Sequence, residues 1–248
     1  MDFLGDVVAW FTDGSNWSGE DGMPHRLWEH TVMCVLALVS AALVALPIGM
    51  LIGHSGRGGA LAINVANLGR AIPSFAIIVL SAQYLEEIGA KPAYIALVAL
   101  AIPPMVTNTL TAIEGVDPEV KESALGMGLT GRQVLTRVEV PMGMPLIMAG
   151  VRTSGVQIVA TATLAALVGW GGLGRYIIDG LATRDFVEVF AGAFAVAVMS
   201  IVAEVLLGAL QARLVPKGLR LDRGRAAPLV ALEPDQRTAL ISPAAGGG

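Results

Sequence analysis

Five long runs of apolar residues constrain the fold of this chain more than any other feature. Each run is long enough for a helix to cross the ~30 Å hydrocarbon core of a bilayer, which takes about 20 residues. Because hydrocarbon offers no partner to an unpaired backbone group, such spans form helices rather than open strands. The sequence therefore predicts an all-α membrane bundle with five spans, at residues 31–52, 61–82, 93–113, 142–168 and 189–210.

The composition agrees with a membrane protein and excludes an ordinary soluble domain. Apolar residues make up 54% of the 248 residues and charged residues only 15%, with a mean hydropathy of +0.69. The lone cysteine, Cys34, lies in an apolar run without a partner for an intrachain disulfide, so we expect it to pack. Residues 1–30 lack the basic flank and cleavage site of a signal peptide, and we interpret them as an external or interfacial lead-in.

The positions of the basic residues predict the orientation of the bundle. With five spans the termini fall on opposite sides, and the side richer in Lys and Arg faces the cytoplasm. We therefore expect the amino terminus outside and the carboxyl terminus inside, with residues 214–248 as a flexible cytoplasmic tail. The richer side carries Arg57, Lys121, Arg132, Arg137, Arg213, Lys217, Arg220, Arg223, Arg225 and Arg237; the other side carries Arg26, Lys91, Arg175 and Arg184.

The polar connection at residues 114–141, between the third and fourth spans, is named here the Glu122 loop. Its first part reads as a short helix, with Asp117 as the N-cap and Pro118 at the first helical position. Gly128 is expected to end this helix and to act as a hinge. The orientation derived above places this loop in the cytoplasm.

The second part of the Glu122 loop reads as another short helix. Thr130 and Gln133 have the spacing of a capping box, which predicts a helix that runs through Val138. Pro141 and Pro145 are then expected to mark the entry to the fourth span.

Spacing along the first short helix predicts an amphipathic surface. Val120, Ala124 and Met127 fall at steps of four and three and should share one face, whereas Lys121 and Glu122 should point away from it. The plainest interpretation is a well-capped connector between two spans. The alternative is a knob that docks on another protein.

The order of residues in the Glu122 loop resembles the EAA loop of ABC importer permeases. That motif is Glu-Ala-Ala, three residues, Gly, nine residues, Ile, one residue and Leu-Pro, and the spacing matches throughout. The sequence differs only by Ser in place of Ala and by Val in place of Ile and of Leu. The matching residues are Glu122, Ser123, Ala124, Gly128, Val138, Val140 and Pro141. The resemblance implies a type I importer permease whose loop couples it to an ATP-hydrolysing subunit.

Three further segments resemble one branch of these permeases, the importers of glycine betaine, carnitine, choline and proline. They are NVANLGRAIPSFAIIVL, IPPMVTNTLTAIEGVDPEVKESALGMG and PLIMAGVRTSGVQIVATATLAALVGWGGLG. The resemblance implies a multi-pass protein of the cytoplasmic membrane that moves an osmoprotectant. The runner-up is a permease for another small solute, such as methionine or a sulfonate.

The same resemblance implies partners rather than catalysis in this chain. It points to a dimer of ATPase subunits that hold ATP and Mg²⁺, a second permease copy or related permease, and an external substrate-binding protein. The chain itself has no P-loop, and we expect it to bind no cofactor, metal or nucleic acid.

Polar residues within the predicted spans are candidates for a translocation path or gate. Asn64, Asn67 and Arg70 recur at steps of three, and Pro73 should break the helix just beyond them. An interhelical polar clasp is an equally good interpretation of these three residues. The other candidates are Asn108, Arg152 and Gln157, and Arg152 has a possible ion-pair partner in Glu204.

The segment between the fourth and fifth spans, residues 169–186, is expected outside. Trp170 and Tyr176 suit an interfacial aromatic belt, and docking of a binding protein is the alternative.

Two other classes of function were weighed. An intramembrane hydrolase is disfavoured because His25, His30 and His54 all lie at or beyond the ends of the first predicted span. A passive channel differs from an importer in that its transport would not depend on ATP.

Overall fold

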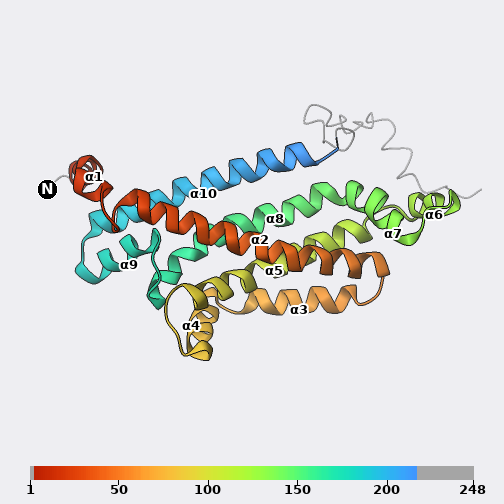
Figure 1. Cartoon of the computed structure of the whole chain (residues 1–248), viewed down its shortest axis with the longest axis horizontal. Coiled ribbons are helices and arrows are strands. Elements are labelled where there is room, and N and C mark those ends of the chain that lie inside the picture. Colours follow the sequence, from red (N-terminus) through yellow and green to blue (C-terminus); the bar gives the residue numbers. More distant parts are fainter. Residues whose placement is uncertain (1–2, 217–248) are drawn as a thin grey trace, which may run out of the picture.

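The computed structural model describes residues 3–216, and every regular element in that part of the chain is helical. Figure 1 shows long helices running side by side along one axis. The α-helices are α1 (Phe3–Thr12), α2 (Met23–Ser55), α3 (Gly59–Ala71), α4 (Ser74–Leu85), α5 (Ala90–Glu114), α6 (Pro118–Gly126), α7 (Gly131–Val134), α8 (Val140–Ala162), α9 (Gly174–Thr183) and α10 (Phe186–Leu214). Three short elements are the 3₁₀-helices η1 (Gly14–Trp17) and η3 (Thr163–Val168) and the π-helical turn η2 (Leu135–Glu139).

Within residues 3–216, four helical segments are long and apolar enough to cross a membrane: α2, α5, α10 and the segment 131–168 that contains α8. A fifth crossing exists only if α3 and α4 together count as one, and these two helices meet at an angle of 88°. Residues 61–82 therefore do not form one straight helix, and the break that was predicted at Pro73 is confirmed. Ile72 is extended, as the residue before a proline prefers, and the ring of Pro73 fixes the start of α4.

The helices also differ from the predicted spans at their ends. Helix α2 begins at Met23 and takes in the last part of the expected lead-in, and residues 3–12 form a helix of their own. The predicted fourth span, 142–168, is α-helical only as far as Ala162 and continues as the 3₁₀-helix η3. The expected tail lies almost wholly outside the described residues, which end at 216.

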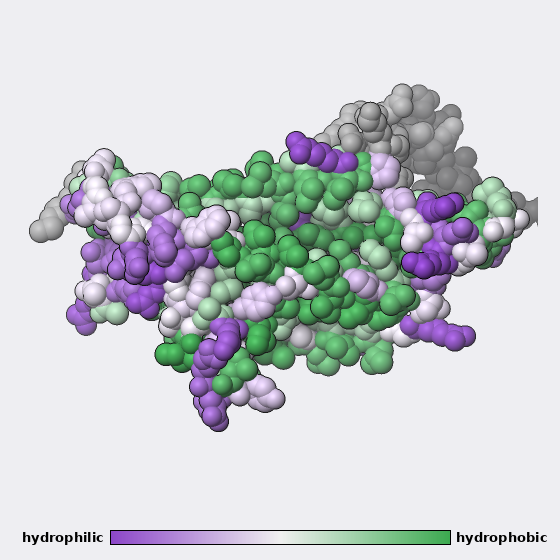
Figure 2. Space-filling model, viewed as in Figure 1, coloured by the Kyte–Doolittle hydropathy of each residue, from purple (hydrophilic) through white to green (hydrophobic). Residues whose placement is uncertain are grey.

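The path of the chain places the Glu122 loop at one end of the bundle. Helices α6 and α7 lie there, whereas α1 and α9 lie at the opposite end, and α10 runs from the α9 end toward the α6 end (Figure 1). A broad hydrophobic belt covers the middle of the molecule, and hydrophilic residues gather mainly at its two ends (Figure 2). The molecule thus has the surface of a protein embedded in a bilayer.

The core forms where α2 and α8 pack on α5. A stripe of small residues at every fourth position of α2 allows a close approach: Ala37, Ala41 and Ala45 are fully buried, and the stripe continues through Gly49 and Gly53. A Cβ atom added at Gly49 would lie 2.7 Å from Thr109 Cβ on α5. Small residues serve in membranes to bring two helix backbones together.

Candidate functional site

The first helix of the Glu122 loop forms as its sequence predicts. The Asp117 side chain accepts a hydrogen bond from the Glu119 N–H at 2.9 Å, and Pro118 occupies the first turn of α6. The helix ends at Gly126, and Gly128 adopts a φ of 88°, a left-handed conformation that favours glycine. The chain can therefore reverse direction sharply just after α6.

The second helix of the loop starts as predicted but is not separate. Thr130 N–H donates to Gln133 Oε1 at 2.8 Å and Gln133 N–H donates to Thr130 Oγ1 at 3.4 Å, which confirms the capping box. From there the backbone passes through η2 directly into α8, so Pro141 lies inside a continuous helical segment. The Val140 N–H reaches back to Leu135 O, and this wider turn accommodates the proline ring that a regular helix would exclude.

The predicted apolar face of α6 is wrong, because its side chains divide between the bundle and solvent. Ala124 is buried at 2% exposure, but Val120 and Met127 are 38% and 75% exposed. Lys121, which was expected to point away with Glu122, instead shares the buried side with Ala124. Its ammonium donates to Ile113 O, 2.9 Å away at the end of α5.

A buried carboxylate explains the direction of Lys121. Glu139 Oε1 lies 3.2 Å from Lys121 Nζ, and Glu139 Oε2 lies 2.6 Å from His54 Nδ1 in the last turn of α2. The Glu139 side chain is only 2% exposed. This cluster, named here the Glu139 clamp, ties α6 to α2 and to the start of α8, because a buried charge needs paired partners.

Sequence reasoning missed the Glu139 clamp. Glu139 occupies the unspecified position between Val138 and Val140, and His54 is 85 residues away in the sequence. The available signal was a lone carboxylate just before an apolar span, in the same loop as a lysine. The sequence around Glu139 and Lys121 does not indicate that the two side chains pair, nor that His54 joins them.

The outer side of the Glu122 loop is free for a partner. Glu122 and Ser123 are exposed, and Glu122 makes no hydrogen bond or ion pair with any residue of 3–216. Gly128 is exposed as well, whereas Val138, Val140 and Pro141 are half-buried at the base of α8.

A polar cavity of about 420 Å³ lies beside the break between α3 and α4 and is named here the break cavity. Four of the candidate path residues line it, namely Arg70, Pro73, Asn108 and Gln157. They come from four elements of the fold, α3, the α3–α4 break, α5 and α8. The structure thus brings together residues that lie up to 87 positions apart, between 70 and 157.

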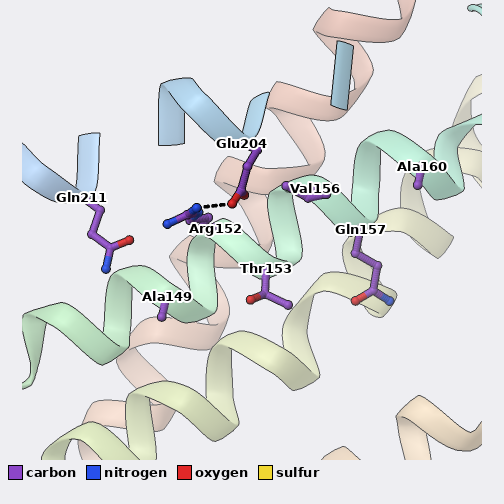
Figure 3. Close-up of a pocket in the computed structure, with 8 residues that line it drawn as sticks. All are labelled: Ala149, Arg152, Thr153, Val156, Gln157, Ala160, Glu204 and Gln211. Atoms are coloured by element: carbon purple, nitrogen blue, oxygen red, sulfur yellow. Dashed lines mark hydrogen bonds and ion pairs between the residues drawn. The ribbon is translucent and has the colours of Figure 1, made fainter. Parts of the chain in front are cut away.

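A second cavity of about 630 Å³ lies between α8 and α10 (Figure 3). Arg152 and Glu204 point toward each other across it and form the ion pair that the sequence suggested. Thr153 and Gln157 line this cavity and the break cavity alike, so the two share part of one wall of α8.

Asn64 and Asn67 do not join this group. Both are exposed on α3, and they line neither of the two polar cavities. The regular spacing of Asn64, Asn67 and Arg70 therefore brings only Arg70 to the break cavity.

The aromatic residues at the opposite end are packed rather than set in a belt, so that expectation is wrong. Trp170 is 9% exposed and Tyr176 is 7% exposed. The Tyr176 hydroxyl donates to Asp21 O at 2.6 Å, and burial raises the pKa of Tyr176 to about 12. Fully buried His30 joins the same region, because its Nδ1 accepts from the Leu173 N–H at 3.2 Å.

Metal ligands do not cluster in the described part of the chain. No group of three His, Cys, Asp or Glu side chains within residues 3–216 could hold a metal ion.

The fold is similar to that of chains in two solved ABC transporter structures. The chain superposes with a TM-score of 0.67 on a chain of the MetNI methionine ABC transporter in inward-facing conformations, at 18% identity, with 76% of this chain and 94% of that chain covered. It superposes with a TM-score of 0.62 on a chain of an amino acid ABC transporter with histidines, at 22% identity, with 86% and 99% covered. At these identities the likeness establishes the fold alone.

Curated relatives are closer in sequence. The chain is 37% identical over 198 residues to the carnitine transport permease protein OpuCB of Listeria monocytogenes, which covers 80% of this chain and 90% of the relative. It is 34% identical over 196 residues to the glycine betaine/carnitine/choline transport system permease protein OpuCB of Bacillus subtilis, with 79% and 90% covered. The osmoprotectant import permease protein OsmW of Salmonella typhimurium is 34% identical over 197 residues, with 78% and 92% covered.

The match to a protein family is equally extensive. Residues 45–218 match the family described as "Binding-protein-dependent transport system inner membrane component". This range contains α3 to α10, the Glu122 loop and both polar cavities. The chain therefore belongs to the family of inner membrane components of binding-protein-dependent transport systems.

Proposed function

We propose that this chain is the permease subunit of an ATP-driven importer of a small osmoprotectant such as glycine betaine, choline, carnitine or proline. The observation that carries the proposal is the identity of 32–37% to permeases named for carnitine, glycine betaine, choline and osmoprotectants. The likeness to a methionine transporter concerns the fold alone, so methionine or a sulfonate remains the second candidate.

The Glu122 loop is the proposed docking site for a cytoplasmic ATPase subunit. Its outer surface offers Glu122 and Ser123 for polar contacts and Val120 and Met127 for apolar contacts. A segment with this mixture of apolar and charged groups suits a specific protein interface. This role requires the α6 end of the bundle to face the cytoplasm, as the basic residues predict.

The Glu139 clamp is the proposed route by which movement of the ATPase reaches the membrane helices. A displacement of α6 moves Lys121, and the ion pair between Lys121 and Glu139 carries that movement to the start of α8. The contact of Glu139 with His54 carries it on to α2. A charge-assisted contact around a buried carboxylate transmits a displacement better than a fully exposed one, because water and salt compete less for its groups.

The proposed translocation path runs along the shared wall of α8, past the two polar cavities. Arg70, Pro73, Asn108, Arg152 and Gln157 line these cavities. A second copy of the chain or a related permease is expected to complete the path, and an external binding protein is expected to deliver the solute at the α9 end. Asn64 and Asn67, which are exposed on α3, stay candidates for the path or for a polar clasp between helices.

Reconstitution tests the proposed function. The chain is purified with its ATPase subunits, placed in proteoliposomes and supplied with its binding protein, and uptake of radiolabelled glycine betaine, choline, carnitine, proline and methionine is measured. We expect uptake of at least one osmoprotectant, with a strict requirement for ATP. Uptake without ATP would instead indicate a passive channel, and uptake of methionine alone would favour the second candidate.

A further inference from the structure

Arg70 is a charged residue near the end of α3, inside the apolar stretch that α3 and α4 form together. It lies eleven residues beyond Gly59, the first residue of α3. At 1.5 Å per residue this is about 16 Å, half the thickness of a ~30 Å hydrocarbon core. A charge at that depth is costly, and such residues usually face a cavity or a partner group rather than lipid.

Arg152, another arginine in an apolar helix of the bundle, has its charge balanced by an ion pair. Arg152 on α8 pairs with Glu204 on α10. Arg70, by contrast, makes no hydrogen bond or ion pair with any residue of 3–216, and its side chain is exposed at the break cavity. Its guanidinium is therefore available to a ligand.

The surroundings of Arg70 favour a negatively charged group. The described residues that line the break cavity include no Asp or Glu. Helix α4 also begins there, at Ser74, and its twelve residues direct the positive end of the helix dipole toward the same space. The Ser74 hydroxyl, Thr153 and Gln157 line the cavity and make no hydrogen bond within the described chain, so they can bond to a solute.

The size of the break cavity suits a small solute. Its volume of about 420 Å³ lies within the range of roughly 300–1,000 Å³ that is usual for small-molecule sites. A planar guanidinium recognises a carboxylate through two parallel hydrogen bonds. Glycine betaine, carnitine and proline carry a carboxylate, whereas choline carries a hydroxyl in its place and is a net cation.

We propose that the break cavity is a solute site in which Arg70 binds the carboxylate of the transported molecule. The permease itself then favours carboxylate-bearing zwitterions over choline, whatever the external binding protein delivers. This inference rests on the proposed function and narrows its substrate class. Arg70 is the group that recognises the carboxylate, and Ser74, Thr153 and Gln157 supply neutral contacts.

Direct binding tests the site. The purified complex of the permease with its ATPase subunits, without binding protein, is placed in nanodiscs, and binding of radiolabelled glycine betaine is measured with carnitine or choline as competitor. We expect saturable binding that carnitine displaces and choline displaces at least about tenfold less well. Substitution Arg70→Gln should raise the Kd for glycine betaine roughly tenfold or more, which equals about 1.4 kcal/mol.

Two further variants separate recognition from folding. Arg70→Lys keeps the charge but loses the bidentate geometry, so its Kd should lie between those of the wild type and Arg70→Gln. Arg57→Gln makes the same chemical change at an exposed arginine in the turn between α2 and α3, outside both polar cavities, and should leave the Kd unchanged. Size-exclusion chromatography of each complex checks assembly.

Several results would overturn the inference. Choline that competes as well as carnitine does is one such result, and normal binding of glycine betaine by Arg70→Gln is another. Dissociation of the complex in both Arg70→Gln and Arg70→Lys would show that Arg70 pairs with a neighbouring subunit instead. If the wild type binds no solute while ATP-dependent uptake proceeds, the site is wrong and the importer function stands; if no osmoprotectant is taken up, the proposed function itself fails.

Discussion

The Glu122 loop and the two polar cavities are both polar interruptions of an apolar chain, but they hold their charges in different ways. In the loop, Lys121 is fixed by Glu139 and by a backbone carbonyl, and the helix ends are capped by near neighbours in sequence. In the cavities, Arg152 depends on a partner 52 residues away, and Arg70 has none within the described chain. The loop thus ties its inner charge to the bundle, whereas the break cavity contains a guanidinium without a partner among the described residues.

The largest effect is expected from removing the buried carboxylate of the loop. Glu139→Ala leaves Lys121 and His54 without their shared partner and should lower the stability of the loop end by about 2–3 kcal/mol. Uptake should fall more than ATP hydrolysis. The control is Glu87→Ala, which breaks the exposed Lys91–Glu87 pair and should cost less than about 1 kcal/mol. Thermal unfolding that shows equal losses for both variants would contradict the clamp.

The next largest effect is expected at the ion pair that lines the cavity between α8 and α10. Arg152→Glu and Glu204→Arg each place two like charges in contact within the membrane and should reduce the yield of assembled complex strongly. The double variant restores an attractive pair and should recover most of the yield. The measurement is the amount of monodisperse complex after detergent extraction, and a double variant no better than either single one would refute the pairing.

A smaller effect is expected at the hinge of the loop. Gly128→Ala forces a residue with a Cβ atom into a left-handed conformation, which costs about 1 kcal/mol, and should lower the number of solute molecules taken up per ATP hydrolysed. The matched control is Gly126→Ala, where a Cβ atom also meets open space but φ is not positive. If the two variants reduce this ratio equally, the conformation of Gly128 is not the cause.

The smallest effect is expected from the capping box. Thr130→Ala removes the acceptor for the Gln133 N–H and should destabilise the start of α7 by about 1 kcal/mol, without changing solute preference. Hydrogen exchange at residues 131–134 measures the fraying. The control is Thr136→Ala, because the Thr136 hydroxyl bonds only to Arg132 O in the same helical segment. Hydrogen exchange at residues 131–134 should then be the same as in the wild type.

Local features of both regions could be predicted from the sequence because they depend on close neighbours. The caps at Asp117 and Thr130 involve residues two or three positions away, and the left-handed Gly128 follows from the need to end a helix. Pro73 likewise marked the end of α3. The angle of 88° between α3 and α4 could not be read in the same way, since it depends on how each helix packs on α5.

The direction of individual side chains was the least predictable feature. The spacing of Val120, Ala124 and Met127 predicted one apolar face, but the attraction of Lys121 to buried Glu139 rotated α6 so that only Ala124 is covered. Similarly, Trp170 and Tyr176 fit an aromatic belt by composition, yet both are buried: Trp170 lies beside His30 of α2, and Tyr176 contacts Trp10 and the Asp21 carbonyl. In each case a partner distant in sequence outweighs the local pattern.

The sequence by itself determined that this protein is an all-helical membrane protein, because apolar length is a property of contiguous residues, and the motif of the Glu122 loop added the resemblance to permeases. The tertiary structure decided which charges are paired and which are free. Glu139 and His54, or Arg70 and Gln157, become neighbours only when helices far apart in the chain pack together. The energy of an ion in a membrane depends on those neighbours, so the pairing of each charge is decided only when the helices pack together.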